Sequence, residues 1–100
     1  MRVTIQYFEG CPHWRLADER VRKVLGPGPQ DDVEVEYQLI DSPEQAQRVG
    51  FHGSPTILVD GHDPFATGEE PIGLTCRVFR TERGPEGSPS EDQLRAVLNQ

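Results

Sequence analysis

The chain has 100 residues, of which 34% are hydrophobic and 27% charged, and its formal net charge is −7. This length predicts one domain over residues 1–100, because two separate cores would each bury too little surface. No apolar run is long enough for a transmembrane helix or a secretory signal, so we expect a cytoplasmic, reducing environment and no membrane partner. The negative charge argues against nucleic acid as a partner.

The first third of the chain predicts a strand, a helix and a second strand. Apolar and polar residues alternate over residues 3–8, which is typical of a strand, and Glu9-Gly10 ends it. Pro12 suits the first turn of a helix, and apolar residues then recur at helical spacing up to Leu25. The run Gly26-Pro27-Gly28-Pro29 ends that helix. Strict alternation over residues 33–39 predicts the second strand.

The middle of the chain predicts a short helix followed by a strand. Ser42 and Gln45 have the spacing of a capping box, and Pro43 is placed at the first helical position. The helix should end near Val49-Gly50. The compact apolar run 56–59 predicts a third strand, closed by a turn.

The last third predicts a long loop, one strand and a terminal helix. Residues 62–74 are rich in proline and glycine and show no periodicity, and loops of that length are often functional. Residues 76–80 have the alternation of a last strand, and residues 84–89 form a flexible connector. Ser90 and Gln93 form a second capping box, which starts a helix through Leu98.

These elements follow the order β-α-β-α-β-β-α and define an α/β protein. Strands joined through a helix are parallel, whereas strands joined directly can pair antiparallel. The order therefore predicts a four-stranded mixed sheet with helices on both faces.

Two short motifs resemble those of thioredoxin-like proteins, whose minimal fold has the same order of elements. The motif Gly10-Cys11-Pro12-His13-Trp14 is similar to their active-site turn, and Gly53-Ser54-Pro55-Thr56 is similar to their cis-proline loop. The segments Asp63-Pro64-Phe65 and Leu74-Thr75-Cys76-Arg77 extend the resemblance to small Gly-Cys-Pro-x-Trp proteins. Some of these carry selenocysteine at the position of Cys11. The resemblance implies that Cys11 is a redox nucleophile.

The chemistry expected at Cys11 agrees with that role. A thiol at the N-terminal edge of a helix is stabilised as a thiolate, so we expect the pKa of Cys11 to lie well below the free value of about 8.5. His13, when protonated, would stabilise the thiolate further, and Pro12 would direct the sulfur outward. The resemblance also implies substrate contacts from Pro12, from Trp14, and from the loop residues Ser54, Pro55 and Thr56. Trp14 shares a helical face with Ala17 and Val21, which favours a core residue over a substrate platform.

The motif departs from the usual dithiol because Trp14 stands where thioredoxins have their second cysteine. We therefore predict a single-thiol oxidoreductase without a cofactor, which reduces peroxides or exchanges disulfides and is regenerated by an external thiol. Cys76 is a candidate resolving thiol. In the plain fold the last strand starts far from Cys11, although the 62–74 loop could return the chain to it.

Two other functions remain open from the sequence. The first is soft-metal or organomercurial binding by Cys11 and Cys76, which a distant resemblance to alkylmercury lyases suggests. The second is a non-catalytic module that binds a partner through its acidic surface and the 62–74 loop. A metal site could also be formed by Cys11, His13 and either His52 or His62. Their spacing in the sequence matches no recognised pattern of metal ligands, so no metal is assigned. The substrate and the oligomeric state are not determined.

Overall fold

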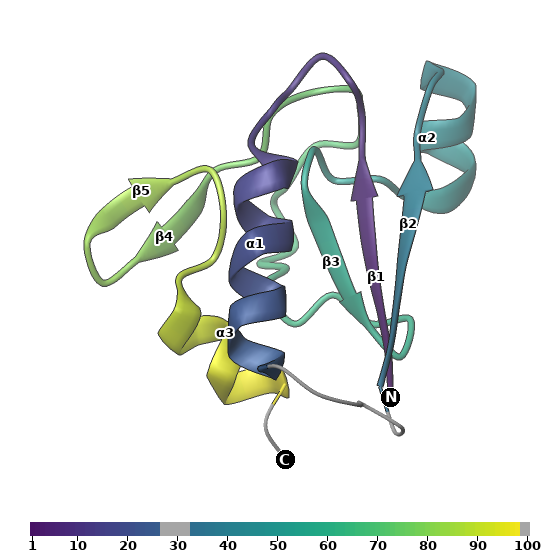
Figure 1. Ribbon diagram of the computed structural model, residues 1–100. Helices are drawn as coiled ribbons and strands as arrows, with labels where there is room; N and C mark the ends of the chain where they lie inside the picture. The colour runs from purple at the N-terminus through teal and green to yellow at the C-terminus, as the bar shows by residue number, and fades with distance from the viewer. Residues whose placement is uncertain (27–32, 99–100) are drawn as a thin grey trace.

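The fold is described by a computed structural model, which covers residues 1–26 and 33–98 (Figure 1). Residues Pro27, Gly28 and Pro29 of the predicted helix stop lie outside the described residues. The elements in chain order are β1 (Arg2–Tyr7), α1 (Trp14–Leu25), β2 (Glu34–Leu39), α2 (Pro43–Val49), β3 (Thr56–Val59), β4 (Phe79–Thr81), β5 (Gly84–Glu86) and α3 (Glu91–Leu98).

The main sheet has three strands in the order β2-β1-β3, rather than the four predicted. β1 pairs parallel with β2, with Val3 opposite Val35, and antiparallel with β3, with Ile5 opposite Ile57. The β1–β2 pair follows the rule that strands joined through a helix run parallel. Strand β3 does not, because it follows α2 and yet runs antiparallel to β1 and therefore to β2. The carboxyl end of the central strand β1 lies beside the segments that build the site.

The core lies between one face of this sheet and two helices. The fully buried side chains that meet there are Val3, Ile5, Ala17, Val21, Ile57 and Leu94. They come from β1, β3, α1 and α3, and Figure 1 shows α1 running along the sheet with α3 crossing below it. Helix α2 instead packs beyond the strand ends through Ile40, Ala46 and Phe51. The opposite sheet face is an open hollow of largely polar side chains, and within residues 1–26 and 33–98 no helix contributes to its lining, in contrast to the predicted helices on both faces.

Of the two predicted capping boxes, that of Ser90 and Gln93 is complete, whereas that of Ser42 and Gln45 has only its serine cap, because Gln45 Oε1 accepts from the Asp41 N–H at 3.1 Å. The Gln45 N–H donates to Ser42 Oγ at 3.1 Å, and the Gln93 N–H donates to Ser90 Oγ at 3.1 Å. The Ser90 N–H also donates to Gln93 Oε1 at 2.9 Å, which completes the reciprocal pair. Helix α1 begins at Trp14, two residues later than predicted. Pro12 lies in the turn before it, and His13 is the N-cap without a side-chain cap bond.

The predicted strand at residues 76–80 is misplaced, because it overlaps β4 only at Phe79 and Arg80. A short antiparallel hairpin, β4–β5, occupies residues 79–86 instead, and it replaces part of the predicted connector. The alternation predicts burial of Cys76 and Val78, but the buried residues are Arg77 and Phe79, and Val78 is 66% exposed. In Figure 1 the hairpin lies on the far side of α1 from the sheet. Among the described residues, no helix has the length and apolar character needed to cross a membrane.

Candidate redox site at the Cys11–Cys76 disulfide

Cys11 and Cys76 are joined by a disulfide bond across a sequence separation of 65 residues, with their Cα atoms 5.7 Å apart. Of the two alternatives that the sequence leaves open, the structure has the one in which the chain returns Cys76 to Cys11. The reason is that Cys76 does not start a strand of the main sheet. It forms a parallel bridge with Ser54 in the proline loop, which lies beside the active-site turn.

Ser54 connects the two cysteine segments through its backbone and its side chain. Its N–H donates to the Thr75 carbonyl at 2.7 Å, and its carbonyl accepts from the Arg77 N–H at 2.9 Å. Its hydroxyl accepts from the Phe8 N–H at 3.3 Å, and Cys11 Sγ lies 3.7 Å from its carbonyl oxygen. The resemblance to thioredoxin-like proteins implies that the backbone of this loop pairs with an extended substrate. In this structure the same backbone pairs with residues 75–77 of the chain itself.

The proline loop itself is fixed by short-range contacts. The peptide bond between Ser54 and Pro55 is cis, and the Thr56 hydroxyl donates to the Gly53 carbonyl at 2.7 Å. Gly53 has φ +107°, and a Cβ there would lie 3.1 Å from Arg77 Cβ. Only glycine tolerates both that backbone conformation and that approach. Ser54, Pro55 and Thr56 are all buried, so their side chains are not available to a substrate.

A buried ion pair holds the Cys76 segment in place. Arg77 Nη1 lies 2.7 Å from Asp63 Oδ2, and the two side chains are 3% and 10% exposed. The guanidinium also lies 4.6 Å from the centre of the Phe79 ring and donates to Thr56 Oγ1 at 3.4 Å. Because a buried charge without a partner is costly, this pair strongly favours the observed path of residues 75–77.

The two halves of the disulfide differ in exposure. Cys11 is 0% exposed, whereas Cys76 is exposed. The prediction that Pro12 directs the Cys11 sulfur outward is therefore wrong for the disulfide form. Pro12 itself is exposed, but the turn after β1 returns inward, with the Cys11 N–H donating to the Phe8 carbonyl at 3.2 Å. A solvent-borne thiol can approach the bond only from the side of Cys76.

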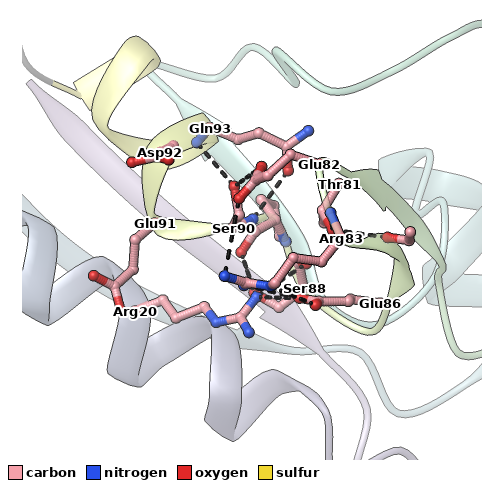
Figure 2. A network of polar contacts seen from close by, with 12 residues as sticks. Arg20, Thr81, Glu82, Arg83, Glu86, Ser88, Ser90, Glu91, Asp92 and Gln93 are labelled. Atoms are coloured by element: carbon pink, nitrogen blue, oxygen red, sulfur yellow. Dashed lines mark hydrogen bonds and ion pairs between the residues drawn. The ribbon is translucent and has the colours of Figure 1, made fainter.

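His13 lies beside the disulfide and is exposed. Its ring packs against Gly87, where a Cβ would lie only 2.4 Å from His13 Nδ1. Gly87 is positioned from α1, because Arg20 Nη1 donates to Glu86 Oε1 at 2.9 Å and to the Pro89 carbonyl at 3.0 Å. Figure 2 shows Arg20 and Glu86 in a polar network that also joins the hairpin to the start of α3 through Glu82 and Ser90.

Trp14 packs mainly on the molecule itself. Its ring centre lies 4.4 Å from that of Tyr7 and 6.4 Å from that of Tyr37, and Arg15 lies over it at 5.1 Å. The side chain is half-buried at the start of α1. Trp14 therefore has a packing role in the fold, whereas a contact with substrate stays a prediction.

The site brings together three groups that can bind a metal. One ligand atom each from Cys11, His13 and Cys76 lie within 4.8 Å of one another. His52 and His62 are elsewhere: His52 Nδ1 is 3.2 Å from the Glu70 carbonyl oxygen, and the His62 carbonyl accepts from the Val59 N–H. The third ligand is thus supplied by the Cys76 segment rather than by either histidine considered from the sequence.

Four residues of the site had no assigned role in the sequence: Arg20, Asp63, Arg77 and Gly87. Asp63 and Arg77 were visible as parts of two motifs, but nothing local shows that they pair across 14 residues. Arg20 and Gly87 carry no signal, because their contact depends on how the hairpin packs on α1. The resemblance of the motifs therefore located the cysteines and the proline, but not the groups that hold them.

Fold and site together define a small α/β protein in which a cysteine just after β1 meets a cis-proline loop. Over 67 residues the chain is 36% identical to a thioredoxin of Methanocaldococcus jannaschii, an alignment that covers 64% of this chain and 78% of that protein. The chain belongs to the thioredoxin family. No family model matches the sequence, and no solved structure matches it significantly.

Proposed function

We propose that this chain is a thiol–disulfide oxidoreductase that uses Cys11 and Cys76 as its redox pair. The observation that carries the proposal is the disulfide between them, formed beside the cis-proline loop with only Cys76 open to solvent. The similarity to a thioredoxin supports the same class of reaction. The substrates are thiols and disulfides, and an external thiol supplies the electrons.

The burial of Cys11 suggests how exchange starts. An incoming thiolate attacks Cys76 Sγ, the accessible sulfur, and forms a mixed disulfide while Cys11 leaves as a thiolate. A second thiol then displaces Cys76 and releases the substrate as a disulfide. Overall, two substrate thiols lose two protons and two electrons, and the chain gains both as two thiols. In the reverse direction, the Cys11 thiolate attacks Cys76 in the mixed disulfide and releases the reduced substrate.

His13 is placed to handle the proton in these steps. Its imidazole lies within 4.8 Å of both sulfurs and is open to solvent. It can accept a proton from a thiol as that thiol attacks, and return it to the thiolate that leaves. Pro12 and Trp14 flank His13 on the same turn and are the residues we propose to contact the substrate.

The finer family placement is also a proposal. The motifs around Cys11, Asp63 and Cys76 support membership of the Gly-Cys-Pro-x-Trp group, in which some proteins have selenocysteine at the first of these positions. In that group a single thiol at Cys11 would be regenerated by external thiols in the cytoplasm. Such a mechanism would need Cys11 to become accessible once the bond to Cys76 is open.

Trapping with glutathione disulfide separates the two mechanisms. We expect Cys11→Ser, with its exposed Cys76 thiol, to form a glutathione adduct quickly, and Cys76→Ser to form one slowly at Cys11. The wild-type chain should instead return to the internal disulfide and release glutathione, as read by intact-protein mass. Full turnover by Cys76→Ser would overturn the two-cysteine proposal in favour of the single thiol. If both variants exchange as fast as the wild-type chain, oxidoreductase function at this site is overturned.

A further inference from the structure

We infer that the reduced chain holds a zinc ion through Cys11, His13 and Cys76. The inference goes beyond the proposed exchange reaction and does not require it, because it concerns binding to the dithiol rather than electron transfer. Two thiolates and one imidazole are a donor set that zinc prefers, and with three protein ligands the fourth position stays open.

The distances suit a single ion. Zinc bonds of about 2.3 Å to sulfur and about 2.0 Å to nitrogen keep tetrahedral ligands roughly 3.5 to 3.8 Å apart. The three donor atoms already lie within 4.8 Å of one another while the disulfide is closed. Opening the S–S bond lets the sulfurs separate to that spacing, with small side-chain rotations around a Cα–Cα distance of 5.7 Å.

The surroundings of the cluster favour a defined site. Cys11 is fully buried, whereas His13 and Cys76 face solvent, so an ion can enter and a water can complete its coordination. The His13 ring is held by close packing against Gly87. Arg20 fixes the chain on either side of Gly87 through Glu86, Ser88 and Pro89, as Figure 2 shows in part. Such support behind a histidine ligand restricts its orientation and raises metal affinity.

Binding and disulfide formation exclude each other, so the site is controlled by redox state. Reduction adds two electrons and two protons to the disulfide and yields two thiols. Zinc then displaces both protons, giving a Zn²⁺–dithiolate and two H⁺, and its affinity therefore falls as the pH is lowered. A bound zinc ion in turn keeps both sulfurs from forming the disulfide.

The direct test is titration of the chain with zinc alone, in competition with a chromophoric chelator. With the chain reduced by a phosphine, which converts the disulfide to thiols and ends as phosphine oxide, we expect one zinc per chain. We expect no binding to the oxidised chain. Cobalt in place of zinc should give thiolate-to-metal charge-transfer bands and the visible bands of a tetrahedral site. Absence of binding by the reduced chain, or equal binding by the oxidised chain, would overturn the inference.

Variants identify the ligands. Cys11→Ser and Cys76→Ser should each remove the charge-transfer band or halve it. His13→Ala removes a direct ligand and should lower zinc affinity by more than the roughly 10- to 100-fold that loss of an outer contact costs. His52→Ala is the matched control and should leave affinity unchanged. Unchanged affinity in His13→Ala would remove histidine from the site and refute the three-ligand assignment.

A second pair tests the support behind His13. Gly87→Ala places a methyl group where the imidazole lies, so we expect a fall in zinc affinity. Gly73→Ala is its control, because a Cβ there meets no atom within 4 Å. If the thiol-exchange test fails while zinc binds as described, the chain is a metal-binding protein. If exchange succeeds and zinc does not bind, only this inference falls.

Discussion

The two cysteines of the disulfide are held by different kinds of structure. Cys11 follows the central strand β1 and precedes α1, whose inner faces meet in the core through Ile5, Ala17 and Val21. Cys76 lies in an irregular segment between the 62–74 loop and the β4–β5 hairpin. That segment is held by two backbone bonds to Ser54 and by the Arg77–Asp63 ion pair.

The difference shows which half of the site can move. Regular structure over a continuous apolar core fixes the Cys11 side through contacts that are shared among β1, β3, α1 and α3. The Cys76 side depends on a few polar contacts, each of which is valuable because it is buried. We therefore expect perturbations to loosen the Cys76 side first.

Reduction should give the largest effect. A disulfide that closes a loop of 65 residues restricts the unfolded chain and stabilises the fold by about 4 kcal/mol in the chain-entropy treatment. We expect reduction to lower the free energy of unfolding in urea by about that amount. In the reduced chain, hydrogen exchange should rise in residues 71–81 and stay low in β1 and α1.

The control for this experiment is the double variant Cys11→Ser/Cys76→Ser. It should unfold at the lower urea concentration both with and without reductant. Equal rises of exchange in β1 and in residues 71–81 would contradict the proposed difference between the two sides.

Removing the partner of Arg77 should give the next largest effect. Asp63→Asn keeps the shape of the side chain but leaves the buried guanidinium uncompensated, so we expect a loss of about 3 kcal/mol in unfolding free energy. Because residues 75–77 then release Ser54, Cys76 should also react faster with external thiols. Urea unfolding and the rate of glutathione attack on the disulfide measure the two effects.

Asp41→Asn is the matched control, since it makes the same charge change on an exposed residue between β2 and α2. The double variant Asp63→Asn/Arg77→Leu should recover much of the stability, because it removes the unpaired charge. A stability loss as large in Asp41→Asn as in Asp63→Asn would show that net charge, not the ion pair, is responsible.

The same contrast explains what the sequence could predict. Strand β3 and the serine caps of α2 and α3 were predicted because hydrophobic patterning and capping are local signals. The Cys76 segment was misplaced because its buried residue is an arginine, which the hydrophobic pattern counts as exposed. Only its pairing with Asp63, a tertiary contact, makes that burial favourable.

The hairpin was missed for a related reason. Its strands have three residues each, and Gly84 and Pro85 give the second the composition of a connector. Its place is set by side chains of other elements, such as Gln93 Nε2 donating to the Arg80 carbonyl at 2.7 Å. The position of Cys11 and the cis-proline loop were predictable from motifs, whereas the partner of Cys11 required the path of the whole 62–78 segment.

The smallest expected effect lies in the loop that leads to Cys76. The Thr67 hydroxyl donates a hydrogen bond to the Glu70 carboxylate, and this bond, helped by the Thr67 N–H, lowers the pKa of that carboxyl from 4.5 to about 2. Because the folded pKa is depressed, the stabilisation is complete above pH 4.5 and is lost as the pH falls towards 2. We expect a carboxyl NMR titration of Glu70 to have its midpoint near pH 2, and Thr67→Val to move it upward. Glu69→Gln, which changes only a neighbouring charge, should leave the midpoint nearly in place. An unshifted midpoint in Thr67→Val would show that this hydrogen bond does not hold the loop. The polar contacts that fix the Cys76 side would then be those of Arg77 and Ser54.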